Sequence, residues 1–238
     1  MKKLIWLLPL ALGGCLGETY RNPEPNPFKS VKRVAVAPFL DRSGAKGFDG
    51  MKAGEAFASE MLMHAGFDVV RPRQVADAAA AKGLKLETAE DYLAVAKALD
   101  ADAIVAAEVT ELNTYYPPRT AVALQLLLTQ RVKSPPENLE KHVVSARPLA
   151  ISPSTAPHLD QHFELVADAG DDNIESSLSS YAAARVAGDS AWKDGEGIAR
   201  SRETYWRFVC ALIVERIVDN ELGRPQPAKH KWSNPEHP

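Results

Sequence analysis

The chain has 238 residues, of which 45% are hydrophobic and 25% are charged, and its formal net charge is −3. These are ordinary values for a globular protein, and the length suffices for one large domain or for one domain with a substantial insert. A mildly acidic chain lacks the basic surface that attracts a polyanion, so the composition argues against nucleic-acid binding.

The first fifteen residues predict export from the cytoplasm. Lys2 and Lys3 form a cationic head, and residues 4–12 form an apolar run that is too short to cross ~30 Å of hydrocarbon as a stable helix. A secretory signal peptide has this layout. The sequence that follows, Leu-Gly-Gly-Cys at residues 12–15, resembles the lipobox of bacterial lipoproteins.

The lipobox resemblance implies that residues 1–14 are removed and that Cys15 receives a diacylglycerol and an acyl chain such as palmitate. The mature chain would have 224 residues, and loss of two lysines would lower its net charge to −5. Each buried CH₂ contributes ~0.8 kcal/mol, so several acyl chains hold a protein stably on a bilayer. The alternative is an unlipidated signal or a plain membrane anchor with an incidental cysteine.

The residue after the predicted lipidation site bears on localisation. Leu16, not an aspartate, follows Cys15. By the sorting rule of the lipoprotein family, this implies the periplasmic face of the outer membrane in a two-membrane bacterium. In a cell with one membrane, it implies the extracytoplasmic side of that membrane.

Residues 15–30 are predicted to be a lipidated tether. Pro23, Pro25 and Pro27 favour an extended chain. Residues 16–29 would reach at most ~45–50 Å at ~3.3 Å per residue. We therefore expect the folded body to stay close to its membrane.

Residues 31–130 alternate between predicted strands and helices. Short apolar runs predict strands at 34–37, 67–70 and 103–112, and helical periodicity predicts helices at 52–64, 74–82 and 88–99. Polar and apolar residues alternate over 120–129, which predicts a further strand antiparallel to the third. The alternation of strands and helices favours an α/β unit with parallel pairing.

The second half of the chain is less regular. Five prolines fall between residues 133 and 160, which we interpret as an irregular insert with a short strand at 142–145. A last sheet strand is predicted at 162–166. Helices are predicted from Asp171 or Asp172 to Val186 and, after a loop at 188–197, from Ile198 to Leu222. The tail, 223–238, is polar and rich in proline, so we expect it to be disordered.

These elements predict one α/β domain over residues 31–222, with an α+β tendency and a mixed sheet of four to five strands. Its characteristic motifs are Arg-Val-Ala-Val-Ala-Pro-Phe at 33–39, Gly-Phe-Asp-Val-Val-Arg at 66–71 and Leu-Asp-Ala-Asp-Ala-Ile-Val-Ala-Ala-Glu-Val-Thr-Glu at 99–111. With the lipobox, they resemble envelope lipoproteins built on the α/β fold of anticodon-binding domains. That group includes the curli-secretion lipoprotein, the lipoprotein activators of penicillin-binding proteins and the amino-terminal domain of TolB.

The resemblance implies a role without enzymatic activity or cofactor, in which the protein binds or scaffolds an envelope protein complex. It supplies no catalytic residues. One alternative is an oligomeric subunit of an envelope secretion apparatus, which leaves homo-oligomerisation open. Another is an envelope hydrolase, which would need a convergent acid–base pair that these residues do not indicate.

The best candidates for partner binding are Tyr115 and Tyr116. They precede two prolines between two predicted strands. Tyrosine is enriched at interface hot spots, so an exposed aromatic elbow could anchor a partner. The alternative is a packed connecting loop.

Other chemical patterns are weak, and no metal site is predicted. His158 and His162 are spaced to meet on one helix face, but a zinc site needs a third ligand. The aspartates near Gly170 lack the spacing of a calcium loop and suit helix capping. Cys210 lies in an apolar helical stretch and is expected in the core, without a disulfide partner if Cys15 is lipidated.

The loop before the first helix offers no recognised active site either. Glycines at 44, 47 and 50 are not followed by the lysine of a phosphate-binding loop, so we predict a mobile connection. No histidine is placed by the sequence to activate Ser43. Glu55 and Glu60 are expected on the solvated side of the first helix.

Overall fold

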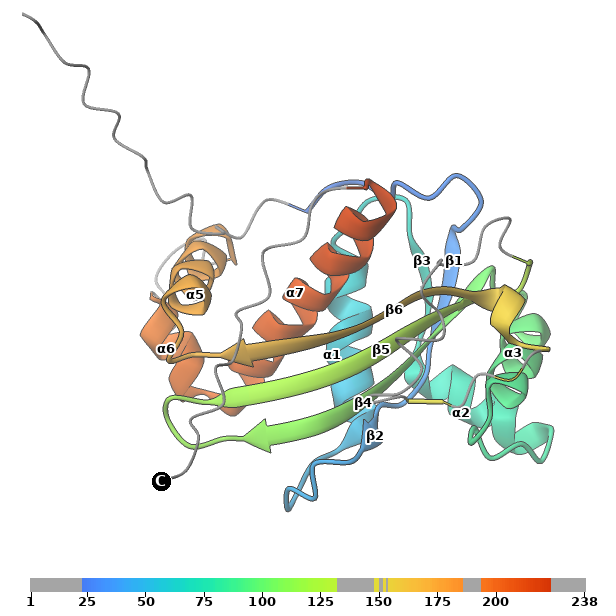
Figure 1. Ribbon diagram of the computed structural model, residues 1–238, viewed down its shortest axis with the longest axis horizontal. Helices are drawn as coiled ribbons and strands as arrows, with labels where there is room; N and C mark the ends of the chain where they lie inside the picture. Colours follow the sequence, from blue (N-terminus) through green and yellow to red (C-terminus); the bar gives the residue numbers. More distant parts are fainter. Residues whose placement is uncertain (1–22, 132–147, 150–151, 153, 186–193, 224–238) are drawn as a thin grey trace, which may run out of the picture.

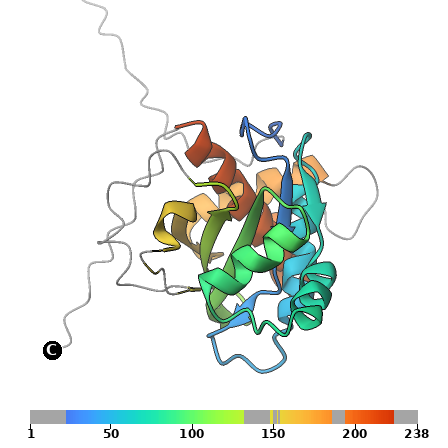
Figure 2. The ribbon, with the colours of Figure 1, turned by 90° about the vertical axis from the view of Figure 1, so that its right-hand side faces the viewer.

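The computed structural model describes residues 23–131, 148–149, 152, 154–185 and 194–223. In these residues, helices lie on both faces of one twisted sheet (Figures 1 and 2). The strand order is β3-β1-β4-β5-β6, and β2 pairs with β4. This is the mixed α/β sheet that the sequence predicts. Its six strands exceed the predicted four to five because the two-residue β2 adds to five longer strands.

The first half of the fold is parallel. β1 (Arg33–Val36) lies between β3 (Asp68–Val70) and β4 (Ala103–Asn113) and is parallel to both. β2 (Leu40–Asp41) continues beside the second half of β4, also in parallel. The connecting helices are α1 (Gly50–Met61), α2 (Pro72–Ala81) and α3 (Ala89–Ala98). All the predicted strands and helices of this half are confirmed.

The second half of the sheet is antiparallel. β4 and β5 (Arg119–Leu128) form a long hairpin, and β5 pairs in turn with β6 (Leu159–Asp168). A bulge interrupts the β4–β5 register between Val109 and Glu111. The antiparallel strand predicted at 120–129 is confirmed, and β6 is longer than the predicted 162–166. The strand predicted at 142–145 lies outside the described residues.

Each face of the sheet has its own hydrophobic core. On one face, α1 and three later helices cover the larger core, which contains Phe57, Val105, Leu124 and Phe208. On the other face, α2 and α3 cover a smaller core around Tyr92, where Ile104 and Leu127 point away from the larger one. Strands buried on both faces explain why residues 103–107 of β4 and 121–128 of β5 are small or apolar, with the exception of Gln125.

The later helices are α5 (Asp172–Arg185), α6 (Gly195–Arg200) and α7 (Arg202–Glu221), and the short 3-10 helix η1 (Ala156–His158) precedes β6. The prediction of one helix over 198–222 is wrong, as is that of a loop reaching Gly197. The helical conformation is interrupted at Ser201, which has an extended backbone (φ −105°, ψ 117°). The side-chain oxygen of Ser201 accepts the backbone N–H of Thr204 and so caps the start of α7. Cys210 is buried in the core on α7, as predicted.

The described part of the predicted tether, residues 23–30, contacts the folded body. The backbone N–H of Asn26 donates to the Ala65 carbonyl at 2.8 Å, and its side-chain amide donates to the Val31 carbonyl at 2.7 Å. Phe28 is 8% exposed, and its ring lies 6.2 Å from that of Phe67. The packed structure therefore begins several residues before the predicted boundary at residue 31.

Candidate functional site

The turn between β4 and β5, residues 114–118, exposes two neighbouring aromatic side chains. Tyr115 is 84% exposed and Tyr116 is 53% exposed. The backbone N–H of Tyr115 donates to the side-chain oxygen of Asn113 at 3.0 Å, which fixes the start of the turn. The packed-loop alternative does not hold for the side chain of Tyr115. We call residues 114–118 the tip.

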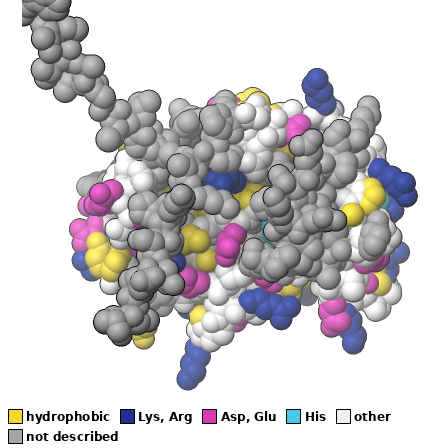
Figure 3. All heavy atoms as spheres, viewed as in Figure 1, with side chains coloured by type: hydrophobic (Ala, Val, Ile, Leu, Met, Phe, Trp, Pro, Cys, Tyr) yellow, Lys and Arg dark blue, Asp and Glu magenta, His cyan; other side chains and the backbone are white. Residues whose placement is uncertain are grey.

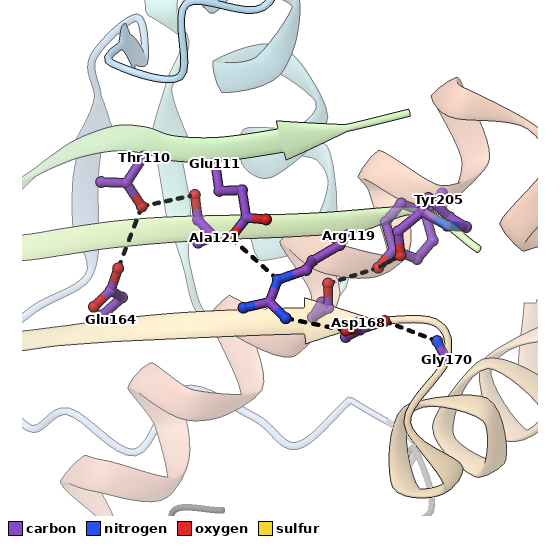
Figure 4. A network of polar contacts seen from close by, with 10 residues as sticks. Thr110, Glu111, Arg119, Ala121, Glu164, Asp168, Gly170 and Tyr205 are labelled. Carbon is purple, nitrogen blue, oxygen red and sulfur yellow. Dashed lines mark hydrogen bonds and ion pairs between the residues drawn. The ribbon is translucent and has the colours of Figure 1, made fainter. Parts of the chain in front are cut away.

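A charged network holds the base of the tip (Figure 4). Arg119 at the start of β5 bonds to Glu111 on β4 at 3.1 Å and to Asp168 on β6 at 3.2 Å. The other oxygen of Asp168 accepts the backbone N–H of Gly170 at 2.9 Å. One guanidinium therefore joins three strands at the end of the sheet, which gives the tip a rigid support.

Tyr205 of α7 reaches the same place from the other face of the sheet. Its hydroxyl donates to the Ala167 carbonyl at 2.9 Å and also lies 3.2 Å from the Pro118 carbonyl. Burial, followed by the nearby charge of Asp168, raises the pKa of Tyr205. The side chain therefore stays neutral and serves as a fixed donor between α7 and the tip.

A groove of about 650 Å³ opens beside the tip. There α1 meets the end of α6, the start of α7, the end of β4 and the start of β5. Its apolar wall contains Phe48 and Trp206, whose rings meet edge to face at 5.9 Å. The indole N–H of Trp206 donates to the Ala53 carbonyl at 3.3 Å. Leu112 and Pro118 line the side of the groove nearest the tip.

The loop before α1 forms one rim of the groove. Gly44 and Gly47 adopt left-handed backbone angles (φ +67° and +77°) that favour glycine. Arg202 donates to the Gly47 carbonyl at 2.5 Å, which ties this loop to α7. The Ser43 hydroxyl donates to Asp41 at 2.8 Å, so it closes a turn rather than facing a base. The two contacts connect the loop to α7 and stabilise its first turn; the predicted mobility of the loop stays a prediction.

Several charged residues of the groove already have structural partners. Asp49 accepts the first backbone N–H groups of α1, and Glu55 pairs with Arg71 at 2.9 Å. Lys52 and Arg202 add positive charge at the rim. The arrangement suits recognition of a chain with mixed apolar and polar groups.

The prediction that Glu60 is solvated is wrong. Glu60 is 1% exposed, because α5 and α7 close over that side of α1. It accepts the hydroxyl of Tyr181 at 3.3 Å and the guanidinium of Arg207 at 3.2 Å, and it pairs with Arg185. This carboxylate joins three helices and holds Arg207 at the wall of the groove. Glu55 does lie on the partly exposed side, as predicted.

The two histidines weighed as metal ligands do not share a helix. His158 lies in η1, where its Nδ1–H donates to the Leu128 carbonyl at 2.8 Å, whereas His162 lies in β6. Asp171 accepts the backbone N–H of Asn173 at 2.8 Å, as expected for a helix cap. Within the described residues, no three histidine, cysteine or acidic side chains are grouped to hold a metal ion.

The predicted lipidation site, Cys15, lies outside the described residues. The sequence singled out Tyr115 and Tyr116 but left open whether they are exposed or packed, and it did not predict the groove. The groove combines four segments that are far apart in the chain, and Trp206 looked like one more apolar residue of a long helix. A tryptophan in the first turns of a helix that begins after Ser201 was the one sequence feature that could have indicated the groove. Within the described ranges, no helix is both long and apolar enough to span a membrane.

No protein-family model matches the sequence, and no curated protein matches it. Several solved structures are similar over part of the chain. The C-terminal domain of LpoB from Salmonella enterica has 13% identity and a TM-score of 0.41, covering 60% of this chain and 87% of that one. Lipoprotein GNA1162 from Neisseria meningitidis has 15% identity and a TM-score of 0.35, covering 57% and 79%. The PelC dodecamer from Paraburkholderia phytofirmans has 14% identity and a TM-score of 0.31, covering 46% and 67%.

Proposed function

We propose that this protein is a lipid-anchored, non-enzymatic binding protein of the cell envelope, and that the tip and the groove hold its protein partner. The observation that carries the proposal is the pair of exposed tyrosines next to a groove with an aromatic wall. Tyrosine and tryptophan are the residues that most often dominate the energy of protein interfaces. Figure 3 shows hydrophobic and acidic side chains together at the left-hand end of the molecule, where the β4–β5 turn and α6 lie.

The direction of the strands supports this role. Val34 of β1 lies opposite Ala103 of β4, and the two strands are parallel. β4 continues to Asn113, so the tip lies ~33 Å beyond the point where the chain enters the sheet, at ~3.3 Å per residue. A body anchored at its amino terminus would therefore present the tip away from the anchor.

The anchor itself rests on the amino-terminal sequence. We propose that Cys15 carries the lipid, that residues 1–14 are removed, and that the protein faces the periplasm from the outer membrane. Replacing Cys15 by serine should abolish lipid labelling and release the protein into the soluble fraction. Unchanged membrane retention of the Cys15→Ser variant would contradict the anchor but not the binding site.

Photocrosslinking in intact cells tests the binding site. A photoreactive amino acid at Tyr115 should capture one envelope protein, whereas the same group at the exposed Lys82, directly after α2, should not. Equal capture from both positions would reject the tip as the site. Capture of only further copies of this chain would favour the oligomeric secretion subunit, and hydrolysis of cell-wall material by the purified protein would favour an enzyme.

A further inference from the structure

The end of the molecule where the chain enters also exposes apolar side chains. Leu62 and Met63, directly after α1, are 42% and 50% exposed, and Leu222, directly after α7, is 42% exposed. These are three of the six large hydrophobic residues exposed in the described part of the chain; two others are the tip tyrosines. Large exposed apolar side chains therefore gather at two opposite ends. Contiguous exposed apolar surface often marks an interaction site.

These three side chains belong to one end of the fold. α1 and α7 begin together, since Arg202 contacts Gly47, and Trp206 contacts Ala53 one turn further on. Both helices therefore run the same way and end on the same side. In Figures 1 and 2, the carboxyl end of α7 lies beside the chain that enters from residue 23.

The entering chain is fixed next to Leu62 and Met63. The Nδ1 atom of His64 lies 2.8 Å from the Glu24 carbonyl, and Asn26 bonds to Ala65. We call this region, residues 23–28, 62–66 and 222–223, the entry end. Lys29 and Lys32, both exposed, follow at the same end.

The length of the remaining chain limits how far this end can be from the anchor. Seven residues, 16–22, separate Cys15 from the first described residue. Fully extended, they reach at most ~25 Å at ~3.3–3.6 Å per residue. A lipid on Cys15 would therefore keep the start of the described chain, and with it the entry end, within about that distance of the bilayer surface.

We propose that the entry end rests on the phospholipid bilayer, with Leu62, Met63 and Leu222 in the boundary between headgroups and acyl chains. This inference rests on the proposed anchor at Cys15. The lysines at the same end suit the headgroup level, since long basic side chains keep their charge in water while their stems cover apolar surface. The contact sets the orientation of the body, so that the tip points away from the membrane.

Hydrogen–deuterium exchange of the mature chain, residues 15–238, tests the contact. Cys15 is coupled to a maleimide phospholipid in phosphatidylcholine vesicles, while Cys210 is buried and does not compete. Amides of residues 61–66 should exchange at least about fivefold more slowly than in protein whose Cys15 is capped with a small maleimide and mixed with the same vesicles. Amides of residues 113–119 should not change. The chemical coupling supplies the anchor whether or not cells lipidate Cys15, so failure here and failure of the Cys15→Ser test are distinguishable.

Two variants make the result specific. The double variant Leu62→Ser, Met63→Ser should lose the slower exchange at 61–66. Val166→Ser, which changes a 44% exposed residue of β6, should keep it. Unchanged exchange at 61–66 on anchoring, slowing at the tip instead, or slowing that persists in the double variant would each overturn the proposal. Slowing in concentrated protein without vesicles would also overturn it, because a protein contact would then cover these residues.

Discussion

The guanidinium of Arg200 lies over the ring of Tyr116, with its central carbon 4.3 Å from the ring centroid. Arg200 ends α6 and is itself held by Glu196 at 2.6 Å. Tyr116 is therefore positioned by a helix, whereas the side chain of Tyr115 projects into solvent. An aromatic group that is already ordered loses less conformational entropy when a partner binds.

Replacing Arg200 by alanine should weaken partner capture without unfolding the protein. An exposed cation–π contact is typically worth a two- to fivefold change in affinity, so we expect about that loss. Arg200→Lys, which keeps a cation over the ring, should lose less, and Tyr116→Ala should lose more. The measurements are crosslinking yield from Tyr115 and the urea midpoint, which should stay at the wild-type value. Full capture by Arg200→Ala would show that the stacking does not position the tyrosine for binding.

The Glu60→Gln variant should be strongly destabilised. Removing one partner of a buried ion pair typically costs ~3–5 kcal/mol, and here two arginines would lose their carboxylate. Glu55→Gln on the same helix is the matched control, since its pair with Arg71 is partly exposed and should cost less than ~1 kcal/mol. Urea unfolding of the two variants measures the difference. Equal losses would mean that the buried network contributes no more than a surface pair.

Glu60 also shows where inference from the sequence ends. Helical periodicity correctly predicts which side of α1 faces the sheet, because apolar residues must leave water there. It does not predict that α5 and α7, more than a hundred residues later, cover the flank that carries Glu60. The partners of a buried charge come from distant segments, so local patterns do not reveal them.

The strands were easier to predict than the groove. The buried parts of β4 and β5 are runs of small and apolar residues. Strands that are buried on both faces can be placed in few ways other than inside a sheet. The prolines between two such strands indicated a turn at Tyr115 and Tyr116 but did not decide between exposed and packed side chains. The groove depends on the loop that Arg202 holds and on the break at Ser201, and neither changes the apolar pattern of the chain.

His64 should make the protein less stable in mild acid. Burial lowers the pKa of His64 from its usual 6.5, more than its bond to the Glu24 carbonyl raises it. Below pH ~6.5, the unfolded chain binds a proton at this residue and the folded protein does not. Folding stability should therefore fall as the pH drops from about 7 to the lowered pKa, by at most ~1.4 kcal/mol per pH unit.

The control for this effect is His64→Gln, which can still donate a hydrogen bond but does not titrate. The quantity to measure is the free energy of unfolding from urea titrations at pH 7.5, 6.5 and 5.5. The wild type should lose more stability than the variant as the pH falls from 7.5 to 5.5, because only the wild type has a titrating group at position 64. The charge of nearby Arg185, which also lowers the pKa of His64, does not change over this pH range. Identical pH dependence in both proteins would show that His64 is not the titrating group.

Cys210 should react with maleimide only when the protein unfolds. The side chain is fully buried on α7, and burial, followed by the charge of Glu60, raises the pKa of its thiol. Because the thiolate is the reactive form, both effects suppress reaction in the folded protein. In a chain with Cys15→Ser, labelling at pH 7 should be negligible over hours and should become rapid across the urea transition. Fast labelling of the folded protein would mean that α7 opens from the sheet. It would also mean that Cys210 competes with Cys15 for the maleimide phospholipid.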